Sequence, residues 1–340
     1  MPTDKLLELE GLTKYFYKPM GLLGRRKQVV QSVDHVSFHI LRHETFGLVG
    51  ESGCGKSVTA SSIMQLLPKL SRIESGAITY HSEKGDIRID QLPRNGKEMR
   101  ALRGRDIAMI FQDPMTALNP VYTIGFQIGE DLKYHTDLDK RSRRARTLEL
   151  LTQMGISTPE KRIDQYPHEF SGGMRQRAMI AIALACSPKL LIADEPTTAL
   201  DVTIQAQVLE LMNELKEKLR TSLLLITHDL GVVAQVCDRV AIMYAGEIVE
   251  SGTIAEVFDH PHHPYTIGLF GSIPSLDETA EKLKPIQGQM PDPTELPEGC
   301  AFAPRCPYAT GACRTRKPEM TGVGGTQMVR CLAHQGVFES

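Results

Sequence analysis

Long apolar runs are missing from this sequence: no stretch of 18 apolar residues occurs, so it predicts no membrane-spanning helix. The first residues, Met1–Leu6, lack the apolar core of a secretory signal, and we expect a cytoplasmic protein in which disulfides are absent. The sequence also lacks an excess of positive charge. Its net charge of −2 argues against a general nucleic-acid binder. The sequence has no internal repeat and no long low-complexity tract. Its 340 residues are enough for one large domain with an appendage, or for two domains.

The segment Gly50–Ser57 has the residues of a phosphate-binding loop, Gly-Glu-Ser-Gly-Cys-Gly-Lys-Ser. It follows a predicted strand at Thr45–Val49 and opens a helix predicted from Lys56, which is the context that this motif requires. Its glycines let the backbone approach phosphate, and the helix N-terminus adds positive partial charge and free N–H groups. Lys56 is expected to reach the β- and γ-phosphates, and the Ser57 hydroxyl to bind Mg²⁺. The expected nucleotide-binding residues of this segment are Gly50, Ser52, Gly53, Cys54, Gly55, Lys56, Ser57 and Val58.

Two adjacent carboxylates follow a second apolar segment. The run Leu190–Ala193 is typical of a strand buried on both faces, and it ends in Asp194 and Glu195. We expect Asp194 to approach the Mg²⁺ of bound ATP, usually through water. Glu195 can accept a proton from an attacking water or orient it. Together with the phosphate loop and a Ser-Gly-Gly turn at Ser171–Gly173, this pair indicates an ATP hydrolase.

Polar side chains also follow two other predicted strands. His228 comes after the strand Ser222–Thr227, and we expect it to contact the γ-phosphate and hold the attacking water. Gln112 comes after the strand Asp106–Phe111 and would be weak evidence alone. The catalytic candidates are therefore Glu195, His228 and Gln112.

A Ser-Gly-Gly turn at Ser171, Gly172 and Gly173 opens a predicted helix that extends to Ala185. The start of such a helix suits an anion, so a phosphate could dock here. Ser171 can equally be an ordinary N-cap, and one residue can serve both purposes.

The alternation of strands and helices predicts an α/β fold with parallel strands. The segment Asp113–Phe170 has no good strand and is expected to be a helical insertion between two strands, while Glu247–Gly252 suggests a closing hairpin strand. We expect a nucleotide-binding domain over residues 1–255 and a small extension over residues 256–340. The other predicted elements are a strand at Arg239–Tyr244, helices at Arg141–Met154 and Thr203–Lys218, and a helix after Leu230.

These motifs together resemble the ATP-binding subunits of ABC transporters, from about Leu6 to Gly252. In that family the phosphate loop is the Walker A motif, the Leu190–Glu195 segment is Walker B, and Gln112 lies in the Q-loop. The segment Ser171–Gln176 matches the signature, with Met174 where Gln is commonest. The resemblance also makes Ala199–Asp201 the D-loop and His228 the switch histidine.

The resemblance implies further contacts to the nucleotide. Phe16 falls where this family places an aromatic ring that stacks on adenine, with Tyr15 as the alternative. Asp201 would belong to the nucleotide site, and Mg²⁺ would be held by Ser57, Gln112 and Asp194. Two such domains pack head to tail in the family, so that the signature of one binds the γ-phosphate held by the other. The helical insertion is where these subunits contact their membrane partner.

Three longer segments are similar to the dipeptide/oligopeptide importers within that family: Phe111–Pro120, Tyr166–Arg177 and Ala193–Gln207. The tail is similar too, with His263–Thr266 followed by the stretch Gly299–Pro307. The resemblance implies an ATPase on the cytoplasmic face of the cell membrane, working with a second ATPase subunit, two permease subunits and an external binding protein. We expect the second ATPase to be a paralogue. Importers of nickel or other small solutes, a soluble ABC ATPase that remodels DNA or ribosomes, and a regulatory metal-binding module are the alternatives.

Four of the seven cysteines, Cys300, Cys306, Cys313 and Cys331, lie in the last 41 residues with spacing C-x₅-C-x₆-C-x₁₇-C. Four thiols in a reducing compartment favour a metal over two disulfides. Zinc ribbons prefer shorter gaps, and the wider spacing suits an iron–sulfur cluster. Some peptide importers that this chain resembles carry a [4Fe–4S] cluster here; zinc and no metal remain the alternatives. The expected role is structural, because the segment Pro285–Ser340 is too short and too rich in Pro and Gly for a core of its own.

Overall fold

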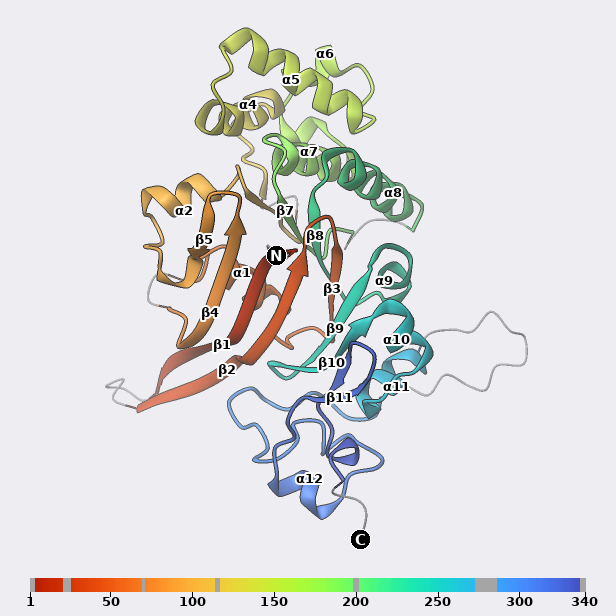
Figure 1. Cartoon of the computed structure of the whole chain (residues 1–340). Coiled ribbons are helices and arrows are strands. Elements are labelled where there is room, and N and C mark those ends of the chain that lie inside the picture. Colours follow the sequence, from red (N-terminus) through yellow and green to blue (C-terminus); the bar gives the residue numbers. More distant parts are fainter. Residues whose placement is uncertain are drawn as a thin grey trace, which may run out of the picture. The chain divides into compact units, whose positions relative to one another are not determined.

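The computed structural model describes residues 4–20, 26–68, 71–113, 117–197, 202–272 and 286–336. The chain forms two compact units, whose helices and strands carry the labels used in Figure 1. The first comprises residues 1–7, 40–45 and 80–226, and the second comprises residues 8–39, 46–79 and 227–340. No helix among the described residues is long and apolar enough to cross a bilayer.

Parallel strands form the centre of the first unit. Strand β7 (Leu190–Asp194) pairs in parallel with β6 (Ile107–Ile110) and with β8 (Ser222–Thr227). Every residue of β7 and β8 is buried, as expected for apolar strands covered on both faces. Because parallel strands end at one edge of a sheet, the residues that follow β6 and β7 are brought to the same edge. The predicted strands at these positions are confirmed within one or two residues.

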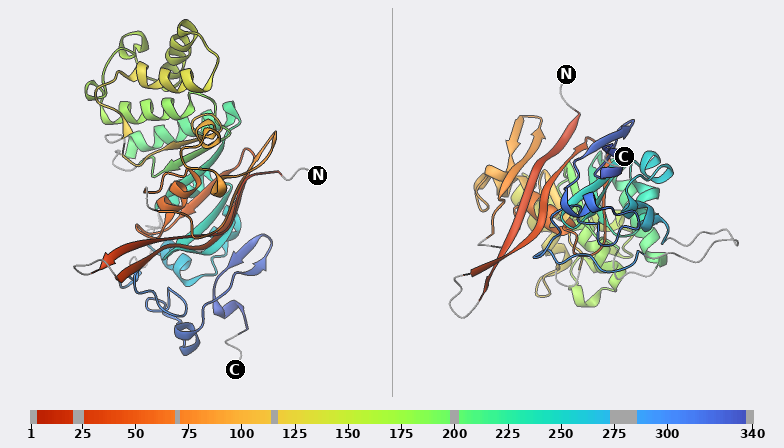
Figure 2. Two further views of the ribbon diagram at one scale, coloured as in Figure 1. Left: turned by 90° about the vertical axis from the view of Figure 1, so that its left-hand side faces the viewer. Right: turned by 90° about the horizontal axis from the view of Figure 1, so that it is seen from below.

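Helices make up most of the rest of the first unit. Helices α4 (Ile124–His135), α5 (Lys140–Gln153) and α7 (Gly172–Leu184) pack against one another, as the yellow-green part of Figure 2 shows. Thr123 caps α4 by accepting from the Phe126 N–H at 3.2 Å, and Asp139 caps α5 by accepting from the Ser142 N–H at 2.7 Å. The described part of residues 113–170 contains helices and no strand, while the bounds of the helical insertion stay a prediction. The remaining bounds are α2 (Lys97–Leu102), α6 (Pro159–Arg162), α8 (Val202–Leu219), β5 (Gly85–Arg88), η1 (Ile89–Gln91) and η2 (Pro167–Glu169).

The second unit contains long strands that the sequence did not predict. These are β1 (Lys5–Met20), β2 (Arg26–Leu41) and β4 (Ser75–Ser82), which lie side by side in the order β2, β1, β4. Along β2 the side chains alternate, with Val36, Phe38 and Ile40 buried and the intervening positions more exposed. This alternation is the pattern of strands that have one covered face.

A further set of strands in the second unit carries the C-terminal residues. Strand β3 (Thr45–Val49) pairs in parallel with β9 (Arg239–Tyr244), and β9 pairs in antiparallel fashion with β10 (Glu247–Thr253). The hairpin of β11 (Thr321–Gly324) and β12 (Gln327–Val329) then pairs with β10. The helices of this unit are α1 (Lys56–Ile63), α9 (Leu230–Val236), α10 (Ile254–Asp259), α11 (Pro264–Phe270), α12 (Gly311–Thr315) and η3 (Leu332–His334).

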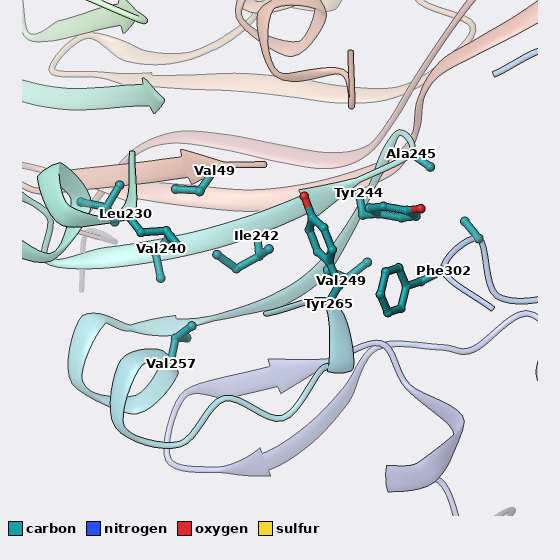
Figure 3. Packing of buried hydrophobic residues seen from close by; sticks show 12 residues of the cluster. Val49, Leu230, Val240, Ile242, Tyr244, Ala245, Val249, Val257, Tyr265 and Phe302 are labelled. Atoms are coloured by element: carbon teal, nitrogen blue, oxygen red, sulfur yellow. The ribbon is translucent and has the colours of Figure 1, made fainter. Parts of the chain in front are cut away.

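The C-terminal extension shares a hydrophobic core with strands β9 and β10. Figure 3 shows the Phe302 ring facing Tyr244 and Tyr265. The ring centres of Phe302 and Tyr244 are 5.2 Å apart in an edge-on arrangement, and Phe302 itself is 2% exposed. The extension therefore packs on the body of the second unit, which supplies the core that so short and proline-rich a segment lacks.

Candidate functional site

The predicted phosphate loop has the expected local structure in the second unit. It connects the buried strand β3 to helix α1, which begins at Lys56. Two glycines are required by close approach: a Cβ at Gly50 would lie 2.2 Å from the Met243 carbonyl oxygen, and one at Gly55 would lie 2.2 Å from the Ser32 carbonyl oxygen. Gly55 also has a φ of +111°, which side-chain-bearing residues rarely adopt. The glycines of the motif at these two positions are thus required by the path of the loop backbone.

Lys56 lies folded against its own loop. Its side chain is buried, and Nζ donates hydrogen bonds to the carbonyl oxygens of Gly50 at 2.7 Å and Glu51 at 3.1 Å. The ammonium group is therefore held over the loop to which a phosphate would bind. Ser57, in the first turn of α1, is exposed, as are Ser52 and Gly53, while Val58 is partly buried.

Cys54 differs from the other residues of the loop, because it is 1% exposed. Burial raises the pKa of its thiol, so it acts as a small buried side chain in the loop. Its carbonyl oxygen accepts a hydrogen bond from the Gly246 N–H at 2.9 Å, which ties the loop to the turn between β9 and β10.

Two catalytic candidates are in contact in the first unit. The Gln112 side-chain amide, just after β6, donates to the Glu195 carboxylate, just after β7, at 2.9 Å. Glu195 has a left-handed backbone with φ of 47°, and its N–H donates to the Ile226 carbonyl oxygen at 2.8 Å. A non-glycine residue in this region is strained by about 1 kcal/mol or more, and such strain often accompanies a functional position. Asp194 is the last residue of β7 and is 6% exposed.

His228 is exposed and comes directly after β8, as predicted. The next residue, Asp229, caps α9 by accepting hydrogen bonds from the N–H groups of Gly231 at 2.9 Å and Val232 at 3.2 Å. The cap fixes the start of the helix and hence the backbone on the C-terminal side of His228.

Ser171 is the N-cap of helix α7. Its hydroxyl accepts from the Met174 N–H at 3.3 Å, so the capping interpretation is correct. The hydroxyl and Gly172 are exposed, and a Cβ on Gly172 would meet no atom within 4 Å. The helix therefore presents an open N-terminus, which is compatible with an anion. The D-loop residue Asp201 lies outside the described residues.

The two aromatic candidates for adenine are differently placed. The Tyr15 hydroxyl donates to the Asp34 carboxylate at 2.8 Å, and burial, followed by this hydrogen bond, raises the pKa of Tyr15. The Phe16 ring has no such bond, and the Lys14 ammonium lies 4.1 Å from its centre. Both rings line a cavity of about 480 Å³ together with Lys27 and Arg72. Phe16 is the freer of the two rings to stack on a base.

The four cysteines of the extension line one cavity of about 530 Å³, although they are spread over 32 residues of sequence. His262 and His263 line it as well. Burial raises the pKa of the Cys300 thiol to about 11, and the other three cysteines add to this shift. Within the described residues, no group of three or more His, Cys, Asp or Glu side chains is arranged to hold a single metal ion. The cavity thus gathers the predicted ligands without forming a ready-made mononuclear site.

One set of contacts at the loop was missed from the sequence. The Arg305 guanidinium, in the extension, pairs with the Glu51 carboxylate, in the phosphate loop, at 2.8 and 3.1 Å. No local pattern links residues so far apart in the chain. In the triplet Pro304–Cys306, the sequence pattern indicates a role only for the cysteine.

Comparisons with known proteins agree with these features. Residues 33–198 match the ABC transporter family, and residues 249–313 match the oligopeptide/dipeptide transporter C-terminal region. The oligopeptide transport ATP-binding protein AppD of Bacillus subtilis is 50% identical over 331 residues, which are 97% of this chain and 97% of that protein. The dipeptide transport ATP-binding protein DppD of the same bacterium is 53% identical over 329 residues, which are 96% of this chain and 94% of that protein.

The fold agrees with that of solved ATP-binding cassettes. The cassette MJ0796, in a post-hydrolysis dimer bound to ADP and phosphate, gives a TM-score of 0.62 at 26% identity. The match covers 73% of this chain and 99% of that cassette. With relatives about 50% identical over nearly its full length, the chain belongs to the ABC transporter ATPases, in the branch that carries the oligopeptide/dipeptide transporter C-terminal region.

Proposed function

We propose that this chain is the ATP-hydrolysing subunit of an importer of dipeptides or oligopeptides. The observation that supports this most strongly is the similarity to peptide transport ATP-binding proteins over nearly the whole chain, the C-terminal region included. Similarity confined to the cassette would support transport of many solutes equally well. The boundary near residue 255 between cassette and extension stays a prediction.

In the proposed reaction, the N–H groups of the loop and the Lys56 ammonium bind the β- and γ-phosphates of ATP. The Ser57 hydroxyl, the Gln112 side chain and the Asp194 carboxylate would hold the Mg²⁺ of the nucleotide, which neutralises phosphate charge. The Phe16 ring stacks on the adenine. Lys56 must then leave the loop carbonyls that it contacts.

Glu195 is the proposed base that orients the attacking water. Its hydrogen bond with Gln112 supports this role, because the amide holds the carboxylate and can sense the nucleotide. His228 contacts the γ-phosphate and keeps the water in line. Both side chains are partly or fully exposed, so they are accessible to a bound nucleotide.

A second cassette is needed to complete each site. Ser171, Gly172 and Gly173 would bind the γ-phosphate that the partner's loop holds, and the open start of α7 supports this. Asp201 would contribute from the D-loop. We propose a paralogous ATPase as the partner, two permease subunits that contact the helical insertion, and an external binding protein. The complex places this chain at the cytoplasmic face of the cell membrane.

The cysteine cavity is proposed to hold a [4Fe–4S] cluster through Cys300, Cys306, Cys313 and Cys331. One observation supports the fit: all four thiols line one cavity. Thiolate ligation would require these half-buried thiols to lose their protons, which the positive charge of the irons would favour. The cluster would cross-link the strands and turns around the cavity.

The transport proposal is tested by reconstituting the chain with its permease subunits, partner ATPase and binding protein in liposomes. Peptide-loaded binding protein should stimulate ATP hydrolysis, and the same complex with Glu195→Gln in this chain is the control. Stimulation by nickel, with none by di- to pentapeptides, would overturn the peptide assignment. ATP hydrolysis indifferent to any binding protein would overturn the transport role.

A further inference from the structure

The phosphate loop is tied to the C-terminal extension by a two-pronged ion pair. Arg305 donates from Nη1 to Glu51 Oε2 at 2.8 Å and from Nη2 to Glu51 Oε1 at 3.1 Å. The Arg305 side chain is 5% exposed and that of Glu51 is 31% exposed. A forked pair of this kind fixes both the position and the orientation of the carboxylate.

Residue 51 is held at its backbone as well. Its N–H donates to the Tyr265 hydroxyl, in α11, at 3.0 Å. Its carbonyl oxygen accepts from Lys56 Nζ at 3.1 Å. Two of the three polar groups of this loop residue are therefore bound by side chains that come after residue 255.

Arg305 is itself fixed in place. Its Nε donates to the Gln287 carbonyl oxygen at 3.0 Å, and its guanidinium lies 5.8 Å from the Tyr244 ring centre and 6.0 Å from that of Phe302. Phe302 belongs to the buried core of the second unit. The planar guanidinium is thus pre-organised, and little side-chain entropy is lost when it binds Glu51.

We propose that Arg305 is a positioning residue of the nucleotide site and acts through Glu51. It has two effects on the loop. It anchors the residue that follows Gly50, and so holds the loop N–H groups in the arrangement that phosphate needs. It also neutralises a carboxylate that would otherwise stand in the phosphate-binding loop and repel the negative charge of ATP.

A simpler role would be to dock the extension without affecting nucleotide. The chain offers a control for that role in Thr326, whose hydroxyl donates to the Glu256 carboxylate at 2.6 Å. That contact also holds part of the extension, the β11–β12 hairpin, but its partner lies in α10 and not in the phosphate loop. Thr326→Val removes the hydroxyl contact while nearly preserving the shape of the side chain, and the backbone N–H of residue 326 still donates to Glu256 at 2.7 Å.

The test measures the dissociation constants of Mg-ADP and of a non-hydrolysable Mg-ATP analogue by calorimetry on the full chain. Arg305→Gln should weaken binding about tenfold, and Arg305→Lys, which keeps the charge without the fork, should lose less. Glu51→Gln removes the repulsive charge. Adding Arg305→Gln to this variant should therefore weaken nucleotide binding by less than a further threefold. Thr326→Val should stay within twofold of the wild type.

Two results would overturn the proposal: Arg305→Gln binding nucleotide within twofold of the wild type, or losing as much affinity in the Glu51→Gln background as alone. Thermal unfolding separates folding from binding, since a docking role would lower the unfolding temperature of both Arg305→Gln and Thr326→Val without changing affinity. If Arg305→Gln does not fold, Arg305→Lys carries the same test. The loss of nucleotide affinity caused by Arg305→Lys must disappear in the Glu51→Gln background. A loss of affinity that persists there refutes the positioning role.

Discussion

The most quantitative prediction concerns His263, a buried histidine at the start of α11. Its side chain is 1% exposed, and its Nδ1 accepts from the Tyr265 N–H at 3.0 Å. The proton of the neutral ring is therefore on Nε2. Burial, followed by the nearby His334, lowers the pKa of His263 from 6.5 to about 3. The folded protein therefore favours the neutral form of this histidine.

The lowered pKa makes stability depend on pH in a defined direction. The unfolded chain binds a proton at His263 below pH 6.5, whereas the folded chain does not until about pH 3. The free energy of unfolding therefore falls as the pH drops through this window. At 1.36 kcal/mol per pH unit, the loss at pH 5.0 is about 2 kcal/mol. Above pH 7.5 this contribution no longer changes.

The variant His263→Asn is the matched comparison. Asparagine is a good N-cap and can accept the same backbone N–H, but it does not titrate. Its loss of ring packing against Phe302, 5.7 Å away between ring centres, costs the same at every pH. Titration of the other groups is shared by both proteins and cancels.

Urea unfolding at pH 7.5 and 5.0 measures the difference. The chain has no tryptophan, so far-UV circular dichroism is the suitable probe. The wild type should lose about 2 kcal/mol more than His263→Asn between the two pH values. Equal losses in the two proteins would show that His263 is not held neutral by the fold, and the reasoning from its burial would be wrong.

Three further predictions concern the chemistry. Glu195→Gln should keep ATP binding but lower the hydrolysis rate about 100-fold or more, whereas Lys56→Ala should weaken nucleotide binding itself; near-normal hydrolysis by Glu195→Gln in a steady-state assay would refute its role. Ser171→Arg should disable the site built on the partner's ATP and spare the site built on Lys56, which single-site trapping of nucleotide can distinguish. Anaerobically purified protein should be brown and contain roughly four irons per chain, fewer in Cys306→Ser; a colourless protein with one zinc would refute the cluster but keep the ligands.

The sequence was most informative where strands are buried on both faces. β3, β7, β8 and β9 are continuous apolar runs next to glycine or charged residues, and their predicted bounds match the structure within one residue. The long strands β1 and β2 were missed, since searching for continuous runs overlooks strands with one covered face. The buried positions of β2, such as Val36, Phe38 and Ile40, show that the alternation was present.

The contacts of the candidate site were likewise predictable only where the residues involved are close together in the sequence. The loop around Lys56 requires its glycines because a Cβ there would clash with backbone atoms, so the sequence motif predicts the loop structure. The contact of Gln112 with Glu195 depends on the parallel pairing of β6 and β7, which a single sequence implies but does not prove. The pairing of Arg305 with Glu51 depends on how the extension packs, and nothing near either residue encodes it.

The packing of the extension changes what a cluster there would do. We expected a segment without a core of its own, pinned by its metal. Phe302 lies in a core that it shares with Tyr244 and Tyr265, and β12 extends the strand pairing of β10. Contacts of this kind persist without any metal, because each buries apolar area or satisfies backbone groups. A cluster bound by the four cysteines, which line a cavity together with Phe302, would then fix the backbone around Arg305, the neighbour of Cys306, more than it would hold the extension onto the cassette.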